Sequence, residues 1–413
     1  MIARFRRPQM LLLAAALVVG LAVRLAFLQR PDFSGDIDVF VSLIHSITLG
    51  GLPNAYDAKL PYPPVTTYIW WLLTAVEPDF RTATNTSDPT IRVLMKVPAV
   101  LADLCLAALV AYALRQRPPW AAAAAAAILL HPGVIDMSAL LGQYDSIYAV
   151  FALAGAILAT SGRNGWAAVL IALSLMTKPQ PAAMLLPFAA YFWATGGWRG
   201  LVRSAAIGAA VVAVLWLPFV AADGPANYLR NLVYYQGEGR SALSVWAWNL
   251  WWLFQELVVG GFAYDSVAIL GPVTVKHVAF LITAALEGLI ALAVIRDPRP
   301  RTLVLALAAS VLVAFSFMTS MHERYSYGAL VFLLLLLPEP RMRWLNLALG
   351  VVFTLNVLAA VPPTPEIEAV LRAPRWIGVL SAIAMLVLTG IVYAMVRRRS
   401  PAFRSPTVAV RHT

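Results

Sequence analysis

The chain has 413 residues, of which 61% are hydrophobic and only 12% are charged, and its formal net charge is +11. Soluble globular chains carry about 25% charged and about 45–50% apolar residues, so the composition excludes an ordinary soluble protein. The basic excess does not indicate a nucleic-acid partner, because it lies at the chain ends and in short links between apolar runs.

Several apolar runs are long enough, at about 18 residues or more, to cross a bilayer as helices. They include residues 10–28, 202–221, 278–295 and 377–396, and they are continuous rather than alternating, which favours helices over barrel strands. The single cysteine, Cys105, lies in an apolar run, so neither a disulfide framework nor a thiolate metal site is expected.

We therefore predict an all-α polytopic membrane protein that forms a single membrane domain over residues 1–413. It should have about twelve spans, near residues 10–29, 93–114, 120–132, 146–161, 165–177, 181–195, 203–221, 278–295, 302–318, 326–338, 344–361 and 376–396. The first run lacks a cleavage site and is too long for a signal sequence, which predicts a retained span. Arginines before the first span and after the last predict a cytoplasmic N-tail (1–9) and a cytoplasmic C-tail (397–413).

Two shorter apolar stretches lie within the long outer loops. Residues 65–76 belong to outer loop 1 (30–92) and residues 245–257 to outer loop 4 (222–276), and both are rich in Trp and Tyr. This composition favours short helices at the membrane interface or re-entrant helices. If both stretches crossed, the protein would have 13–14 spans.

The acidic residues are distributed unevenly across the predicted topology. Cytoplasmic links and tails hold only Asp297 and Glu339, so eighteen of the twenty acidic residues lie outside or within spans. Because acidic residues do little to orient a membrane protein, their accumulation indicates a functional site on the outer face.

The first candidate pair is Asp36 and Asp38, directly after the first span. Residues at i and i+2 do not share a helix face, but they can share a site where the backbone is extended or turning. A carboxylate at the membrane surface can serve as a general base toward a hydroxyl. Alternatively, Asp36 or Ser34 caps a helix over residues 39–49.

Two further segments place polar groups at predicted span ends. The motif Tyr62-Pro63-Pro64 predicts a rigid helix start, because proline is favoured in the first helical turn. The segment 141–146 contains Gln143 and Asp145, which either line a polar cavity or simply end a helix.

Cationic candidates follow in two motifs and one loop. Lys178, followed by prolines at positions 179 and 181, can neutralise a phosphate or extend its amine to the membrane surface. The motif His322-Glu323-Arg324 is not a zinc-protease pattern, because Ser326 stands where the second histidine would be. His322 and Arg324 are therefore predicted anion donors, with an Arg324–Glu323 ion pair as the structural alternative. Residues 234–240, with two glycines, predict a flexible loop.

Taken in order, these motifs resemble those of the GT-C integral-membrane glycosyltransferases, over residues 10–335. The series comprises the Asp36 turn, Tyr62-Pro63-Pro64, Lys96-Val97-Pro98-Ala99 running to Asp103, Gly142-Gln143-Tyr144-Asp145, Lys178-Pro179-Gln180 and His322-Glu323-Arg324. The nearest groups are the dolichyl-phosphate-glucose-dependent glucosyltransferases of N-glycan assembly and the bacterial relatives of the GPI-anchor mannosyltransferases.

The resemblance implies inverting transfer of a hexose, mannose or glucose, from a polyprenyl-phosphate donor to a hydroxyl. The acceptor would be a glycolipid, a lipid-linked glycan or a protein at the non-cytoplasmic face of the plasma membrane. Mapped by motif, Asp36 is the catalytic base and Asp38 a second acid. The implied donor-phosphate residues are Lys178, His322, Arg324 and Arg240, and the implied sugar and acceptor residues are Gln143, Asp145, Gln236 and Tyr62.

The predicted chemistry needs no cofactor. A lipid phosphate is already a good leaving group, and cations aimed at its developing charge supply the required stabilisation. The two acids could bind a divalent metal ion, but we expect none. The alternatives are a lipid flippase or transporter, for which midplane binding and inverted repeats are typical, and a glycan ligase, which would need a larger outer loop.

Overall fold

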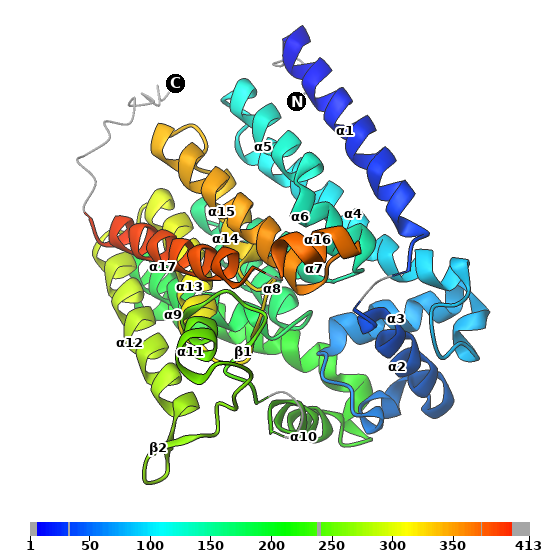
Figure 1. The fold of residues 1–413 in the computed structure, drawn as a ribbon. Helices are drawn as coiled ribbons and strands as arrows, with labels where there is room; N and C mark the ends of the chain where they lie inside the picture. The colour runs from blue at the N-terminus through cyan, green and yellow to red at the C-terminus, as the bar shows by residue number, and fades with distance from the viewer. Residues whose placement is uncertain (1–5, 32–33, 238–240, 373, 399–413) are drawn as a thin grey trace.

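The computed structural model describes residues 6–31, 34–237, 241–372 and 374–398, and it shows a bundle of helices with a few very short strands (Figure 1). Seven helices in this described part are long and apolar enough to cross a membrane. They are α1 (Arg7–Leu28), α4 (Pro89–Ala113), α9 (Leu185–Val220, with the preceding 3₁₀ turn Gln180–Met184), α12 (Val275–Arg296), α13 (Pro300–Phe317), α15 (Pro340–Ala360) and α17 (Arg375–Arg397). The predicted all-α polytopic class is confirmed.

The number of full-length spans is lower than the predicted twelve, because several predicted spans are short or broken helices. α5 (Pro118–Leu130) continues after a 52° bend into Pro132–Leu140, which makes an eighth span if the pair crosses together. α7 (Asp145–Thr160), α8 (Asn164–Leu175) and α14 (Tyr327–Leu334) are shorter. The predicted spans 181–195 and 203–221 share α9, which is broken at Gly197 (φ 61°, ψ −166°).

The predicted short helices of the long outer loops are present. Outer loop 1 holds α2 (Asp36–Gly50), α3 (Pro64–Val76) and the 3₁₀ helices Leu52–Ala58 and Pro78–Arg81. Outer loop 4 holds α10 (Gly224–Gly237), α11 (Leu250–Phe254) and the π-turn Gln255–Val259. The helices α6 (Pro132–Ile135) and α16 (Pro365–Leu371) and the π-turn Asp136–Leu140 complete the helical part. In Figure 1, α2, α3 and α10 lie toward the lower edge, whereas α1 begins at the upper edge.

The strands were not predicted. β1 (Ser244–Val245) pairs in parallel with β4 (Met321–His322), and β2 (Ala268–Leu270) forms a hairpin with β3 (Val273–Thr274). The β1–β4 pairing places Val245 opposite His322, so outer loop 4 is tied to the His322 motif by backbone hydrogen bonds.

A buried ion pair joins the first half of the bundle. Arg24 of α1 lies 2.9 Å from Asp103 of α4, and both side chains are fully buried. Ser138 and Ser146 also donate to Asp103, at 2.6 and 2.5 Å. A buried ion pair is tolerated when further hydrogen bonds satisfy its remaining lone pairs, and here those bonds come from two more segments of the chain.

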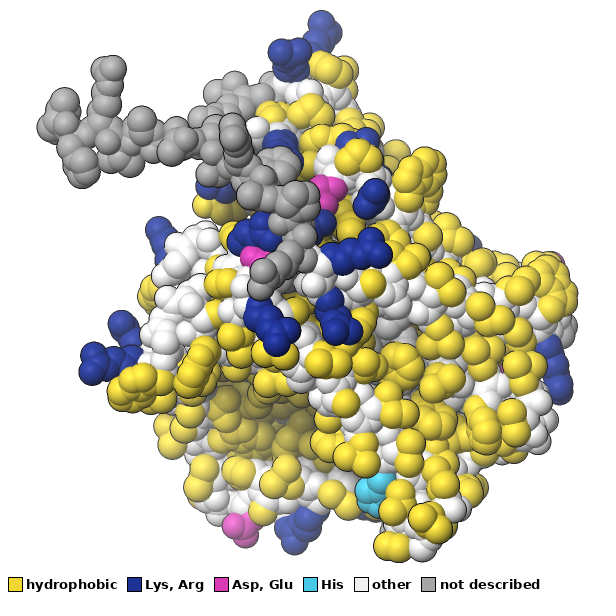
Figure 2. All heavy atoms as spheres, turned by 90° about the vertical axis from the view of Figure 1, so that its left-hand side faces the viewer, with side chains coloured by type: hydrophobic (Ala, Val, Ile, Leu, Met, Phe, Trp, Pro, Cys, Tyr) yellow, Lys and Arg dark blue, Asp and Glu magenta, His cyan; other side chains and the backbone are white. Residues whose placement is uncertain are grey.

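Basic side chains gather at one end of the molecule. Figure 2, which shows the face toward α12 and α17, has its Lys and Arg side chains mostly in the upper half, with few acidic side chains among them. The lower half of the same face is largely hydrophobic and is hollowed at its centre (Figure 2).

Candidate active site

Asp36 is held at the first position of α2. Gly35 adopts a left-handed conformation (φ 72°), and the Asp36 backbone N–H donates to Ser34 Oγ at 3.1 Å. The helix thus begins at Asp36, three residues before the predicted start. The Asp36 carboxylate accepts a hydrogen bond from Gln143 Nε2 (2.7 Å) and lies 3.5 Å from Arg324 Nη2.

Gly142 allows the Gln143 loop to approach α2. Its φ is +60°, which L side chains rarely adopt, and a Cβ atom there would lie 2.9 Å from Ile37 Cδ1. Without a side chain at position 142, the backbone passes directly over Ile37 and delivers Gln143 to Asp36.

Asp38 is not brought to the same place. Its carboxylate accepts from the Thr86 backbone N–H at 2.7 Å and from Thr86 Oγ1 at 2.6 Å, so it holds the end of outer loop 1 against α2. Its role as a second catalytic acid stays a prediction.

Arg324 lies between two carboxylates. Its Nη2 faces Asp36, and its Nε lies 3.8 Å from Asp145 Oδ2. Asp145, the first residue of α7, also accepts from Lys178 Nζ at 2.8 Å, and both of these side chains are buried. The structure thus connects Asp36, Arg324, Asp145 and Lys178, which come from four distant parts of the sequence.

The start of α3 is fixed to the segment that carries Lys178. The Val65 backbone N–H donates to Met176 O at 2.8 Å, and Thr66 Oγ1 donates to Thr177 O at 2.7 Å. The predicted helix start at the proline pair is confirmed, since α3 begins at Pro64. Because of these bonds, Tyr62 and Lys178 line the same cavity.

Glu323 pairs with both of its neighbours. Arg324 Nη1 donates to Glu323 Oε1 at 2.6 Å, and His322 Nδ1 lies 3.7 Å from Glu323 Oε2. Burial raises the pKa of Glu323, but the positive charge of Arg324 and the contact with His322 outweigh it and lower the pKa to about 2. The ion pair considered from sequence is present, and it orients Arg324 rather than removing it from the site.

Asp265 braces the strand that carries His322, a contact that the sequence analysis missed. It is fully buried, accepts from Thr319 Oγ1 at 2.7 Å and lies 3.5 Å from Lys276 Nζ at the start of α12. No local motif marks Asp265, because its partners are distant in sequence.

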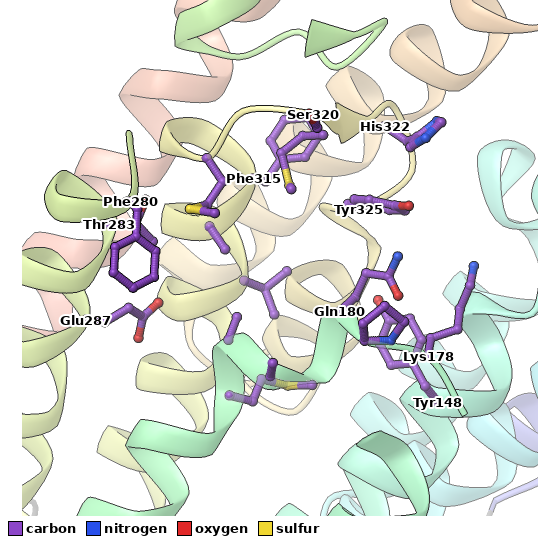
Figure 3. A pocket seen from close by; sticks show the side chains of 18 of the residues that line it. Tyr148, Lys178, Gln180, Phe280, Thr283, Glu287, Phe315, Ser320, His322 and Tyr325 are labelled. Atoms are coloured by element: carbon purple, nitrogen blue, oxygen red, sulfur yellow. The ribbon is translucent and has the colours of Figure 1, made fainter. Parts of the chain in front are cut away.

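A cavity of about 440 Å³ opens beside these residues. Its polar end is formed by Tyr62, Lys178, Gln180, His322 and Tyr325. The opposite end is mainly apolar, and Figure 3 shows Phe280, Thr283 and Glu287 of α12 there, across the cavity from Lys178 and Gln180.

The protonation of the polar end follows from its burial. Burial lowers the pKa of Lys178, and Asp145 opposes this shift. Burial also raises the pKa of Tyr62 and raises that of Tyr325 to about 12, so both phenols are neutral hydrogen-bonding groups at neutral pH. One N–H of Lys178 binds Asp145, and an ammonium has three donors, so Lys178 can also bind an anion.

Two predicted site residues have no described side chain. Nothing is described for Arg240 or for the side chain of Gln236, and their roles stay predictions. Among the side chains that are described, no group of three or more His, Cys, Asp or Glu is placed to hold a metal ion; metal independence is likewise still a prediction.

The site thus combines a carboxylate with buried cations beside a cavity in a polytopic helical bundle. A family model, Glycosyltransferase family 87, matches residues 60–320, which is more than half of the chain. The chain belongs to glycosyltransferase family 87.

Comparison with the solved structure of ArnT supports the fold. ArnT from Cupriavidus metallidurans, in a structure bound to undecaprenyl phosphate, has a TM-score of 0.50 and 16% sequence identity, over 93% of this chain and 77% of that one. The archaeal oligosaccharyltransferase AglB from Archaeoglobus fulgidus, in complex with an inhibitory peptide and a dolichol-phosphate, has a TM-score of 0.44 and 13% identity, over 96% of this chain and 57% of that one. A search of curated proteins finds no match.

Proposed function

We propose that the protein is an inverting hexosyltransferase that moves mannose or glucose from a polyprenyl-phosphate donor to an acceptor hydroxyl. The acceptor is a glycolipid, a lipid-linked glycan or a protein. The site faces the non-cytoplasmic side of the membrane, and both termini are cytoplasmic, as the basic end of the molecule favours.

One arrangement carries this proposal: Asp36 is linked through Arg324 and Asp145 to Lys178, which lines the cavity. The cavity is polar at Lys178 and His322 and mainly apolar along α13, where Val311, Ala314 and Phe315 line it. Thr283 and Glu287 are polar side chains on its α12 side. This polarity suits a ligand with an anionic head and a hydrocarbon chain. The ArnT structure, which is similar in fold, is bound to undecaprenyl phosphate, and this supports a lipid phosphate as the ligand class.

In the proposed reaction, Asp36 accepts the proton of the acceptor hydroxyl while that oxygen attacks the anomeric carbon from the face opposite the phosphate. A new glycosidic C–O bond forms, the bond between the anomeric carbon and the phosphate oxygen breaks, and the polyprenyl phosphate leaves with the electron pair. Lys178, Arg324 and His322 stabilise the charge that develops on the phosphate. The configuration at the anomeric carbon inverts.

The test uses purified full-length protein with mannosyl- and glucosyl-polyprenyl phosphate, and transfer is measured by mass spectrometry of the released lipid phosphate and the glycosylated acceptor. We expect turnover with one donor and its loss in Asp36→Asn. Asp79→Asn, which removes an exposed acid from the same outer loop, should retain wild-type turnover. Substantial turnover in Asp36→Asn would overturn the assignment of the base, and no turnover with either donor would overturn the proposed reaction.

A further inference from the structure

A second cleft lies at the end of the molecule opposite the candidate active site. It has a volume of about 200 Å³ and is formed where the C-terminal turns of α12 and α17 meet. Lys276 marks the end of α12 near the candidate active site, because its partner Asp265 braces the strand that carries His322. Arg296 lies twenty residues later, at the other end of the same helix. At about 1.5 Å per helical residue, the two ends of α12 are about 30 Å apart, which is the thickness of the hydrocarbon core of a bilayer.

The cleft combines positive charge with an apolar wall. Arg296, Arg397 and Arg398 line it together with Leu289, Leu292 and Val396. Figure 2 shows the face toward α12 and α17, with Lys and Arg side chains gathered mostly in its upper half.

The arginines of the cleft lack acidic partners within the described residues. The one acid of the cleft, Asp297, is bound by Arg299 through two N–H groups at 2.5 Å and by Thr302 Oγ1 at 2.9 Å. No described carboxylate forms an ion pair with Arg296, Arg397 or Arg398. The C-terminal segment that follows Arg398, residues 399–413, contains no Asp or Glu in its sequence.

We propose that this cleft binds the headgroup of an anionic phospholipid from the leaflet opposite the active site. The arginines provide donors for the phosphate, and the leucines and Val396 contact the first part of the acyl chains. Basic pockets between spanning helices are suited to anionic headgroups. The alternative is that these arginines only orient the protein; that role requires positive charge at this end but no cleft.

The experiment compares lipid retention by purified full-length protein, using native mass spectrometry with phosphatidylglycerol and phosphatidylcholine as probes. The site variant carries Arg296→Gln, Arg397→Gln and Arg398→Gln. The matched control carries Arg163→Gln, Arg199→Gln and Arg203→Gln, which removes the same charge from exposed residues outside the cleft. A second site variant, Leu289→Trp, narrows the cleft without changing its charge.

We expect the wild type and the control to retain phosphatidylglycerol over phosphatidylcholine, and the site variant to bind phosphatidylglycerol about tenfold more weakly. Leu289→Trp should also weaken retention. Equal weakening in the site and control variants would overturn the proposal in favour of a general charge effect, and unchanged retention in both site variants would overturn it outright. Neither result depends on the proposed transferase reaction.

Discussion

The Lys178 ammonium, at the polar end of the cavity, lies 2.8 Å from the Asp145 carboxylate, and both side chains are buried. The pair gives each charge a partner when the site is empty, which reduces the cost of keeping both in a poorly solvated place. A donor phosphate that enters the cavity meets an amine that is already oriented.

The first prediction concerns pH. Burial lowers the pKa of Lys178 from its ordinary value of about 10.4, so its charge is present below that lowered pKa and is lost as the pH rises through it. The KM for the donor should therefore increase at alkaline pH, before an ordinary lysine would titrate. Lys178→Arg keeps its charge at all accessible pH values. In this variant the alkaline limb of the pH profile, where kcat/KM for the donor falls, should move to higher pH, whatever the effect on the maximal rate.

The measurement is kcat/KM for the donor from pH 6 to 10.5, with Lys276→Arg as the control, since Lys276 lies outside the cavity of Lys178. An alkaline limb that is the same in Lys178→Arg and the wild type would show that another group titrates.

Glu323 is predicted to position its neighbours without titrating in the working range. Its pKa of about 2 keeps it ionised above pH 4. The stability that it contributes is fully present above the unfolded pKa of about 4.3 and is lost progressively as the pH falls from there through about 2. Glu323→Gln should lower kcat by about tenfold or more, because Arg324 loses its charged partner, while the acid limb of the pH profile stays in place.

The matched control is Glu368→Gln, which disrupts the exposed Glu368–Arg372 pair (2.9 Å) and should leave kcat unchanged. A shift of the acid limb in Glu323→Gln would contradict the assigned ionisation.

Gly142→Ala should damage activity through close contacts with two neighbouring side chains. The added methyl would approach Ile37 Cδ1 to 2.9 Å and Lys96 Cγ to 3.1 Å and push the Gln143 loop away from α2. We expect a fall in kcat of about tenfold or more, since small displacements at a reacting group are costly. Gly162→Ala introduces an alanine at a similar φ (+75°) with nothing within 4 Å, and it measures the backbone strain alone.

The double variant Gly142→Ala/Ile37→Val removes Cδ1 and should recover part of the lost rate. No recovery would mean that backbone strain at position 142 or the contact with Lys96, rather than the contact with Ile37, limits the enzyme.

The sequence predicted those parts of the fold and site that depend on local patterns. Apolar run length located the spanning helices, and the proline pair located the start of α3, because both effects act within one helix. The motif residues Asp36, Gln143, Asp145, Lys178 and Arg324 were selected individually, and the structure brings them together.

What could not be predicted depends on contacts between distant residues. The sequence placed Asp36 and Asp38 two residues apart, yet the first turn of α2 directs Asp36 to Gln143 and Asp38 to Thr86. Asp265 and the β1–β4 pairing have no local pattern, because each strand has only two residues and its partner lies far along the chain.

The last prediction concerns the buried pair of Arg24 and Asp103. Arg24→Met would leave the Asp103 carboxylate with only the hydroxyls of Ser138 and Ser146, in a place that water does not reach. Loss of one partner from a buried ion pair costs about 3–5 kcal/mol, whereas the exposed Glu368–Arg372 pair should contribute no more than about 1 kcal/mol.

Thermal unfolding in detergent should therefore show large losses of stability for Arg24→Met and for Asp103→Leu, and a smaller loss for the double variant than the sum of the two. Additive losses would show that the two side chains act independently. Because Ser146 binds Asp103 and directly follows Asp145, the single variants should also reduce transfer at temperatures below their unfolding, and the double variant should recover more stability than activity.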